Sequence, residues 1–170
     1  MFVLDTNVIS ELRHGKPNQS RAVRAWAAVQ PSSKLFLTAI TILELEMGVL
    51  ALERRTPPQG GALRAWLDGV RLAFVDRILP FTGNTAPVCA ALHVPDPRSD
   101  RDAMIAATAL EHRFTVVTRN ISDFAGTGVA LVNPWLKQGS SKNYLAAAFK
   151  SAALSVSSQV NSGSSRPKCP

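Results

Sequence analysis

The sequence predicts a three-layer α/β/α fold, in which a central parallel sheet carries helices on both faces. Short apolar runs alternate along the chain with longer segments whose apolar residues recur at helical spacing. This alternation favours parallel strands joined by helices. The chain has 170 residues, of which 46% are hydrophobic, and this is enough for one domain with a buried core.

The first 54 residues contain two strands, each followed by helical segments. The predicted strands are short apolar runs, and the predicted helices begin beside Thr, Asn or Ser, which are favourable N-cap residues. In chain order we expect a strand over 2–4, a short helix capped by Thr6 or Asn7 and reaching about Leu12, a helix starting at Asn18 or Ser20, a strand over 35–37 and a helix over 38–54.

The alternation continues after a break in the chain. Two prolines and two glycines within residues 56–61 predict that break, because both residue types interrupt regular structure. Two further prolines predict a loop over 94–100. The remaining expected elements are helices over 62–74, 84–92 and 102–112, and strands over 78–81, 115–118 and 129–132.

The composition changes after Trp135. The rest of the chain is rich in Ser, Lys, Gly and Ala. A helix is possible over 144–156, and residues 157–170 are expected to be disordered. We therefore predict a folded domain over 1–136 and a basic, serine-rich tail over 137–170.

The net charge of +7 gives little information about partners. A basic chain suggests a polyanionic partner, but the tail contains five basic residues and no acidic one, so the domain itself is nearly neutral. The two cysteines are far apart, which argues against a disulfide framework or a cysteine metal site. No apolar run is long enough to span a bilayer or to form a signal-peptide core. We expect a cytoplasmic protein with no membrane contact.

Four carboxylates are the candidate functional residues, and three of them lie at strand ends or helix starts. Asp5 and Asp123 come just after predicted strands, and Asp102 begins a predicted helix. Each has an ordinary interpretation, as a helix N-cap, a turn residue and a favourable helix-start charge respectively. Gathered in one pocket they would repel one another, and a cation bound by oxygen ligands, such as Mg²⁺ or Mn²⁺, is the usual remedy.

The fourth carboxylate, Glu44, lies in a helix that is apolar nearly all round and is therefore expected to be buried. A buried carboxylate is costly unless it is paired, hydrogen-bonded or bound to a metal. Glu46 follows two positions later, so the two side chains point roughly 200° apart and at most one is expected to face a given site. Helical geometry does not choose between them. Asp96 and Asp100 are likewise alternatives to Asp102.

The sequence resembles the PIN-domain family over residues 1–136, and its likeness is greatest to VapC-type toxins of toxin–antitoxin systems. Four motifs occur in the family's order at suitable separations, and a closing segment also fits. The motifs are 3–11 with Asp5, 41–48 with Glu44, 100–109 with Asp102 and 117–124 with Asp123, and the closing segment is 132–135.

This resemblance implies a Mg²⁺- or Mn²⁺-dependent endoribonuclease. The four acids would bind one or two cations, with Asp5 as the central ligand. The resemblance also implies that Asn7, Thr118 and Asn120 orient the ligands or bound water, and that Arg119 either contacts a substrate phosphate or forms a surface ion pair. The implied partners are an RNA substrate, a cognate antitoxin and a second copy of the chain, with DNA reached only through the antitoxin.

Two other functions stay open at this point. A non-catalytic PIN module that binds RNA or protein would be expected to lack metal-binding acids, and all four are present. A phosphatase of the haloacid dehalogenase type also places an aspartate after its first strand, but it needs a second carboxylate at the position of Asn7.

Overall fold

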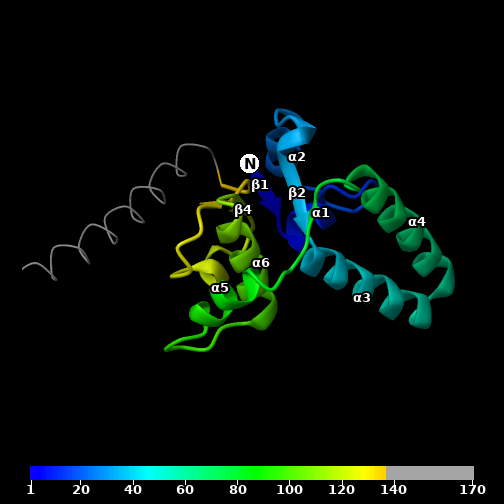
Figure 1. The fold of residues 1–170 in the computed structure, drawn as a ribbon. Coiled ribbons are helices and arrows are strands. Elements are labelled where there is room, and N and C mark those ends of the chain that lie inside the picture. The colour runs from blue at the N-terminus through cyan, green and yellow to red at the C-terminus, as the bar shows by residue number, and fades with distance from the viewer. Residues whose placement is uncertain (137–170) are drawn as a thin grey trace, which may run out of the picture.

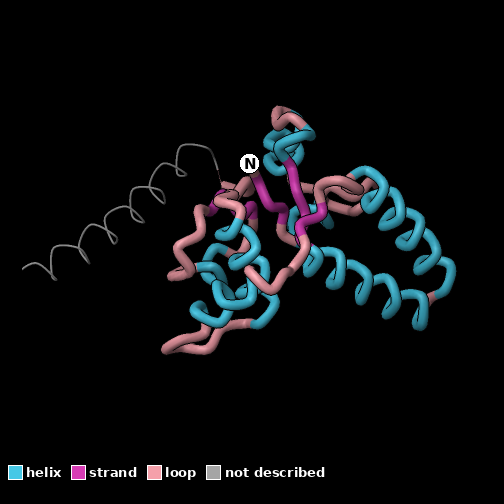
Figure 2. Tube along the Cα trace, in the orientation of Figure 1, coloured by secondary structure: helices cyan, strands magenta, loops and turns pink. Residues whose placement is uncertain are grey.

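The computed structural model describes residues 1–136, and the expectations for 137–170, including the helix over 144–156, lie outside the described residues. The described chain forms a five-stranded sheet of order β3-β2-β1-β4-β5, in which all neighbouring strands are parallel. Helices pack on both faces of this sheet (Figures 1 and 2), so the predicted fold class is confirmed. The strands are β1 (Phe2–Leu4), β2 (Leu35–Thr38), β3 (Ile78–Leu79), β4 (Thr115–Val117) and β5 (Leu131–Val132).

The helices follow the predicted order, and a side-chain cap explains where three of the six helices within residues 1–136 begin. The hydroxyl of Ser20 accepts a hydrogen bond from the backbone of Val23, and the hydroxyl of Thr38 accepts one from Thr41. Within residues 1–136, no helix is both long enough and apolar enough to cross a membrane. The helices are α1 (Thr6–Glu11), α2 (Arg21–Ala28), α3 (Ala39–Arg55), α4 (Pro57–Ala73), α5 (Thr85–Leu92) and α6 (Asp100–Glu111), with 3-10 turns η1 (Ser32–Lys34) and η2 (Ile121–Phe124).

The cap of α1 corrects one prediction. Asp5, rather than Thr6 or Asn7, is the N-cap, since its backbone is extended and its carboxylate accepts the N–H of Thr6. The reason is that helical geometry already begins at Thr6, directly after β1.

The predicted break over 56–61 was wrong in extent, because it is confined to Thr56 and α4 begins at Pro57. Proline in the first turn of a helix loses no intrahelical hydrogen bond. Gly60 serves close packing, since a Cβ there would lie 2.4 Å from the Cα of Glu53. As a result α3 and α4 form a tight hairpin that projects from the sheet (Figure 1).

Two apolar layers hold the sheet between its helices. On one face, Leu4 and Val117 pack in a cluster with residues of α1 to α4. On the other face, Val3 and Val116 pack against α6 and η2. Buried alanines let α6 pack closely on both sides. Ala106 and Ala109 belong to the cluster against the sheet, whereas Ala103 and Ala107 pack with Cys89 of α5. The consequence is a rigid frame around the carboxyl ends of β1 and β4.

Candidate active site

The sheet order creates a topological switch point between β1 and β4. From β1 the chain crosses to β2 and β3 on one side, and β4 and β5 are added on the other. Open α/β sheets bind their ligands at the carboxyl ends of the strands beside such a point. Asp5 directly follows β1 and Thr118 directly follows β4, and the backbone N–H of Asp5 donates to the carbonyl of Val117 (3.0 Å).

Asp5 is buried at this point and held by three hydrogen bonds. Its Oδ2 accepts from the Asn7 side chain (2.5 Å) and from the Thr118 hydroxyl (2.6 Å), while its Oδ1 accepts from the Thr6 backbone N–H (2.6 Å). A carboxylate offers about four lone-pair positions. The network therefore fixes the orientation of Asp5 and still leaves Oδ1 able to bind one more group.

The pKa of Asp5 is raised above its ordinary value. Burial is the largest cause, and the nearby charges of Glu44 and Asp102 raise this pKa further, whereas the hydrogen bonds from Thr118 and Thr6 lower it. Burial and neighbouring negative charge both disfavour an ionised carboxylate. Glu44 and Asp102 are therefore close enough to act on the charge of Asp5, and the three residues are called the acid cluster below.

The other two members of the acid cluster, Glu44 and Asp102, lie on two different helices. Glu44, on α3, accepts a hydrogen bond from the Thr6 hydroxyl, and Asp102 lies half-buried in the first turn of α6. Glu46 points elsewhere, since it forms an ion pair with Arg64 of α4 (2.6 Å). The structure thus places Glu44, and not Glu46, beside Asp5.

The polar residues expected around the acids form a continuous network. The Asn7 side chain donates to the Thr118 hydroxyl (3.1 Å) and accepts the backbone N–H of Arg119 (3.2 Å). Asn120 takes part through its backbone N–H, which donates to the Thr118 hydroxyl (3.0 Å). The guanidinium group of Arg119 lies over the ring of Trp135, 5.8 Å from its centroid.

Asp123 is not joined to the acid cluster by any contact among residues 1–136. It lies exposed on η2, where its carboxylate accepts from the Ser122 hydroxyl (3.2 Å). Asp96 and Asp100 are exposed as well. In this part of the chain, no three Asp, Glu, His or Cys side chains converge closely enough to hold a metal ion as they stand. The four-acid ligand set therefore stays a prediction.

The donor chemistry of the acid cluster nevertheless fits a hard divalent cation. All its ligating atoms are carboxylate oxygens, which Mg²⁺ and Mn²⁺ prefer. Burial and the charges of Glu44 and Asp102 raise the pKa of Asp5, and a cation bound beside it would lower that pKa again.

Two residues of this region, Thr6 and Arg101, were not among the predicted site residues. Thr6 binds both Asp5 and Glu44, and Nη1 of Arg101 lies 3.7 Å from Oε1 of Glu44. Thr6 follows Asp5 and Arg101 precedes Asp102 in the sequence. This adjacency was the one signal by which they could have been predicted. Their cross-chain contacts depend on how α3 and α6 pack, which local patterns do not reveal.

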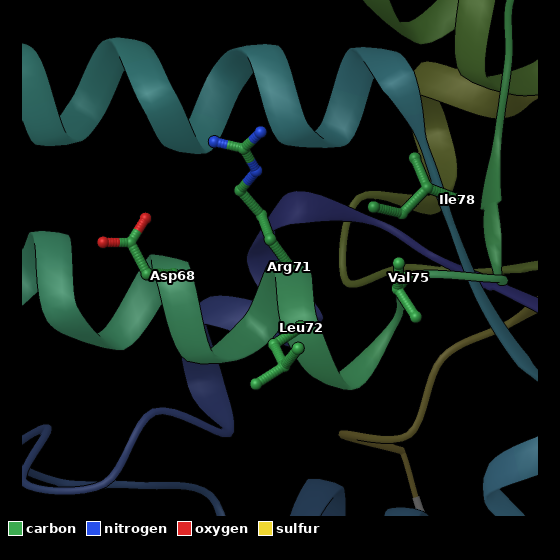
Figure 3. Close-up of a pocket in the computed structure, with 5 residues that line it drawn as sticks. All are labelled: Asp68, Arg71, Leu72, Val75 and Ile78. Carbon is green, nitrogen blue, oxygen red and sulfur yellow. The ribbon is translucent and has the colours of Figure 1, made fainter.

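A hollow lies beside the end of α4, away from these residues. Its lining side chains are Asp68, Arg71, Leu72, Val75 and Ile78 (Figure 3). None of them belongs to the predicted site, and Arg71 and Leu72 point in different directions. The candidate active site is therefore the region around Asp5.

Comparisons with known proteins identify the family of this chain. The PIN domain family model matches residues 2–128. The chain is 41% identical to VapC ribonuclease Y4jK of Sinorhizobium fredii, over 79% of this chain and 98% of that protein. It is 36% identical to toxin FitB of Neisseria gonorrhoeae, over 79% of this chain and 99% of that protein.

Solved structures give the same result. A FitAB complex bound to an IR36 DNA fragment superposes with a TM-score of 0.73 and 33% identity, covering 81% of this chain and 98% of the other. The crystal structure of FitAcB from Neisseria gonorrhoeae superposes with a TM-score of 0.71 and 36% identity, covering 81% of this chain and all of the other. The family match also excludes the haloacid dehalogenase alternative. The chain belongs to the PIN domain family.

Proposed function

We propose that this protein is a metal-dependent endoribonuclease and the toxin of a toxin–antitoxin pair. The observation that carries the proposal is the acid cluster at the β1–β4 switch point of a PIN domain. The names of its relatives support it, since one is a VapC ribonuclease and another is a toxin. A non-catalytic module has less support, because these acids would repel one another without a cationic ligand to bind.

PIN-domain ribonucleases generally depend on divalent metal ions, and we propose Mg²⁺ or Mn²⁺ for this chain. Asp5, Glu44, Asp102 and Asp123 are the proposed ligands. A cation bound there stabilises negative charge on the phosphate and lowers the pKa of bound water. The chain's own part is to orient the ligands. Thr118 and Asn7 hold Asp5, and the Thr6 hydroxyl holds Glu44. Such supporting hydrogen bonds fix ligand geometry before the substrate binds.

We propose that water, and not the ribose 2′-hydroxyl, attacks the phosphorus atom. Within residues 1–136, the hydrogen bonds and ion pairs of the acid cluster involve no histidine, and carboxylates that bind a cation favour water as the nucleophile. Attack by water breaks the bond to the 3′-oxygen. The expected products therefore carry 5′-phosphate and 3′-hydroxyl ends.

The proposed partners are an antitoxin protein and a second copy of the chain, with DNA bound only through the antitoxin. A partner protein and a link to DNA are supported by the structural neighbour FitAB, which is bound to an IR36 DNA fragment. An exposed apolar stripe on α3 is the surface that we assign to a protein partner. It consists of Leu43, Met47 and Leu50, which are 47%, 45% and 54% exposed and recur at helical spacing. Apolar residues gathered on one exposed face often mark a protein interface.

Incubation of the purified protein with total RNA tests the proposed activity. We expect cleavage with Mg²⁺ or Mn²⁺, no cleavage with excess EDTA, and mapped products with 5′-phosphate ends. Undiminished cleavage in EDTA, or 2′,3′-cyclic phosphate ends, would contradict the proposed mechanism. RNA that is bound but never cut would favour the non-catalytic module instead.

A further inference from the structure

Arg101 is the basic residue that the structure places against the acid cluster. It lies in the first turn of α6, and its guanidinium Nη1 is 3.7 Å from Oε1 of Glu44. Of the ion pairs among residues 1–136, this is the one that involves a member of the acid cluster. Contacts therefore run from Arg101 to Glu44, from Glu44 to Thr6, and from Thr6 to Asp5.

The guanidinium group of Arg101 is available for another ligand. The 3.7 Å separation is too long for a hydrogen bond, and Arg101 donates none of its N–H groups to another described residue. Its side chain is 49% exposed. By contrast, Arg64 and Arg98 donate hydrogen bonds to carboxylate or carbonyl oxygens, and Arg119 stacks on Trp135.

The position of Arg101 is unfavourable for helix stability. The N-terminus of a helix carries partial positive charge, so a basic side chain in the first turn opposes the helix dipole. Its one ion pair, with Glu44, is long and half-exposed, and such pairs add little stability. Residues that depart from local preferences in this way are often functional. A role in binding an anion explains Arg101 better than a role in folding.

We propose that Arg101, in place of Arg119, binds a backbone phosphate of the RNA substrate beside the acid cluster. This inference rests on the proposed ribonuclease function. The planar guanidinium group matches two phosphate oxygens with two parallel N–H donors. A cation held by the acids would compete with Arg101 for the charge of Glu44. Metal binding would then release the guanidinium group towards the phosphate.

Two measurements on the full chain separate this role from support of Glu44. Mn²⁺ affinity is measured by calorimetry without RNA, and affinity for a labelled single-stranded RNA is measured by anisotropy in Ca²⁺ over a range of salt concentrations. The variants are Arg101→Ala, Arg101→Lys and the control Arg54→Ala, which removes the same charge from the exposed last turn of α3.

For Arg101→Ala we expect RNA binding to weaken by about tenfold, as for the loss of one charge-assisted contact, and the salt slope to fall by about one. Mn²⁺ affinity should be unchanged or higher, because a competing positive charge has been removed. Arg101→Lys should recover part of the RNA affinity, and Arg54→Ala should match the wild type in both measurements.

Unchanged RNA affinity in Arg101→Ala would overturn the proposal. Weaker Mn²⁺ binding with unchanged RNA affinity would assign Arg101 to holding Glu44 instead. Failure of the proposed ribonuclease function gives a different result, because the wild type itself would then bind no Mn²⁺ and leave RNA uncut. That result would remove the basis of the Arg101 assignment as well.

Discussion

At the scale of single residues, Asp5 combines the role of a helix cap with the properties of a metal ligand. Its carboxylate accepts the first N–H of α1 and two side-chain hydrogen bonds, yet its pKa stays raised because burial outweighs these contacts. An ordinary cap is exposed and needs no further partner. The buried carboxylate of Asp5 is instead arranged to be stabilised by a cation.

Thr118 offers a test of how this arrangement is maintained. The Thr118→Val substitution keeps the shape of the side chain, but it removes the hydrogen bond from Thr118 that lowers the pKa of Asp5. Since the ionised carboxylate is the form that binds a cation, the acidic limb of the activity–pH profile should move to higher pH. Activity should fall by about 10–100-fold, as for other residues that orient metal ligands.

The matched control is Thr108→Val. Thr108 is also fully buried, but its hydroxyl bonds the carbonyl of Met104 within α6. This control should leave the pH profile in place. An unchanged profile in Thr118→Val would show that its hydroxyl does not tune Asp5.

Glu11 gives a separate prediction for stability. This buried carboxylate pairs with Lys16 and accepts the backbone N–H of Ser20 (2.5 Å), so it joins the end of α1 to the start of α2. The hydrogen bond from Lys16, followed by that from Ser20, holds its pKa below the ordinary value of 4.5. A lowered pKa in the folded state contributes stability above the unfolded-state pKa, and that stability is lost as the pH falls through the folded-state pKa.

Glu11→Gln should therefore lower the free energy of unfolding at neutral pH by about 1.5–3 kcal/mol, the usual value for hydrogen bonds to a charged group. The difference from the wild type should shrink as the pH falls below 4.5. Urea unfolding of both proteins, from neutral pH to below 4.5, measures this difference in the free energy of unfolding. A difference that does not change with pH would exclude the charge of Glu11 as the cause.

The site could be predicted only in part at this scale. The end of the apolar run at Asp5 and the motif around Asp102 are visible in the sequence, so both acids were expected. The bond between Thr6 and Glu44 links residues 38 positions apart, and it depends on how α3 crosses α1. No local pattern reports such a contact.

At the scale of elements, the α3–α4 hairpin shows how glycine can be misinterpreted. Its glycines and prolines predicted a loop over 56–61, whereas the structure continues as helix from Pro57. A sequence pattern detects that a residue is small or lacks an N–H group. It does not detect that the small size is needed for a neighbouring helix, as at Gly60.

Gly60→Ala should destabilise this hairpin. Its new Cβ would lie 2.4 Å from the Cα of Glu53, so the helices must separate, and overpacking of this kind costs about 1–3 kcal/mol. The control Gly61→Ala meets no atom within 4 Å and should be neutral or stabilising by about 0.5–1 kcal/mol, because alanine is the better helix former. Urea unfolding distinguishes the two variants, and equal stability would contradict the close approach of α3 and α4.

At the scale of the whole molecule, function follows from the order of the strands. The sequence predicts parallel strands but not that β1 lies between β2 and β4, because that order is set by long-range packing. This order brings Asp5 and Thr118 together across 113 positions. In the same arrangement, Glu44 on α3 and Asp102 on α6 lie at the edge of the sheet where Asp5 lies. The metal-dependent ribonuclease proposal depends on this convergence.

RNA cleavage by Asp5→Asn, compared with the wild type in Mg²⁺ or Mn²⁺, tests this claim most directly. We expect no cleavage, because a neutral amide is a much weaker ligand than a carboxylate. The metal-free variant should melt close to the wild type. The change removes a buried charge and its repulsion by Glu44 and Asp102, but the new NH2 group cannot accept the hydrogen bonds that Asp5 accepts on one of its two oxygens. A fully active Asp5→Asn protein would contradict the account, because Asp5 would then be only a helix cap.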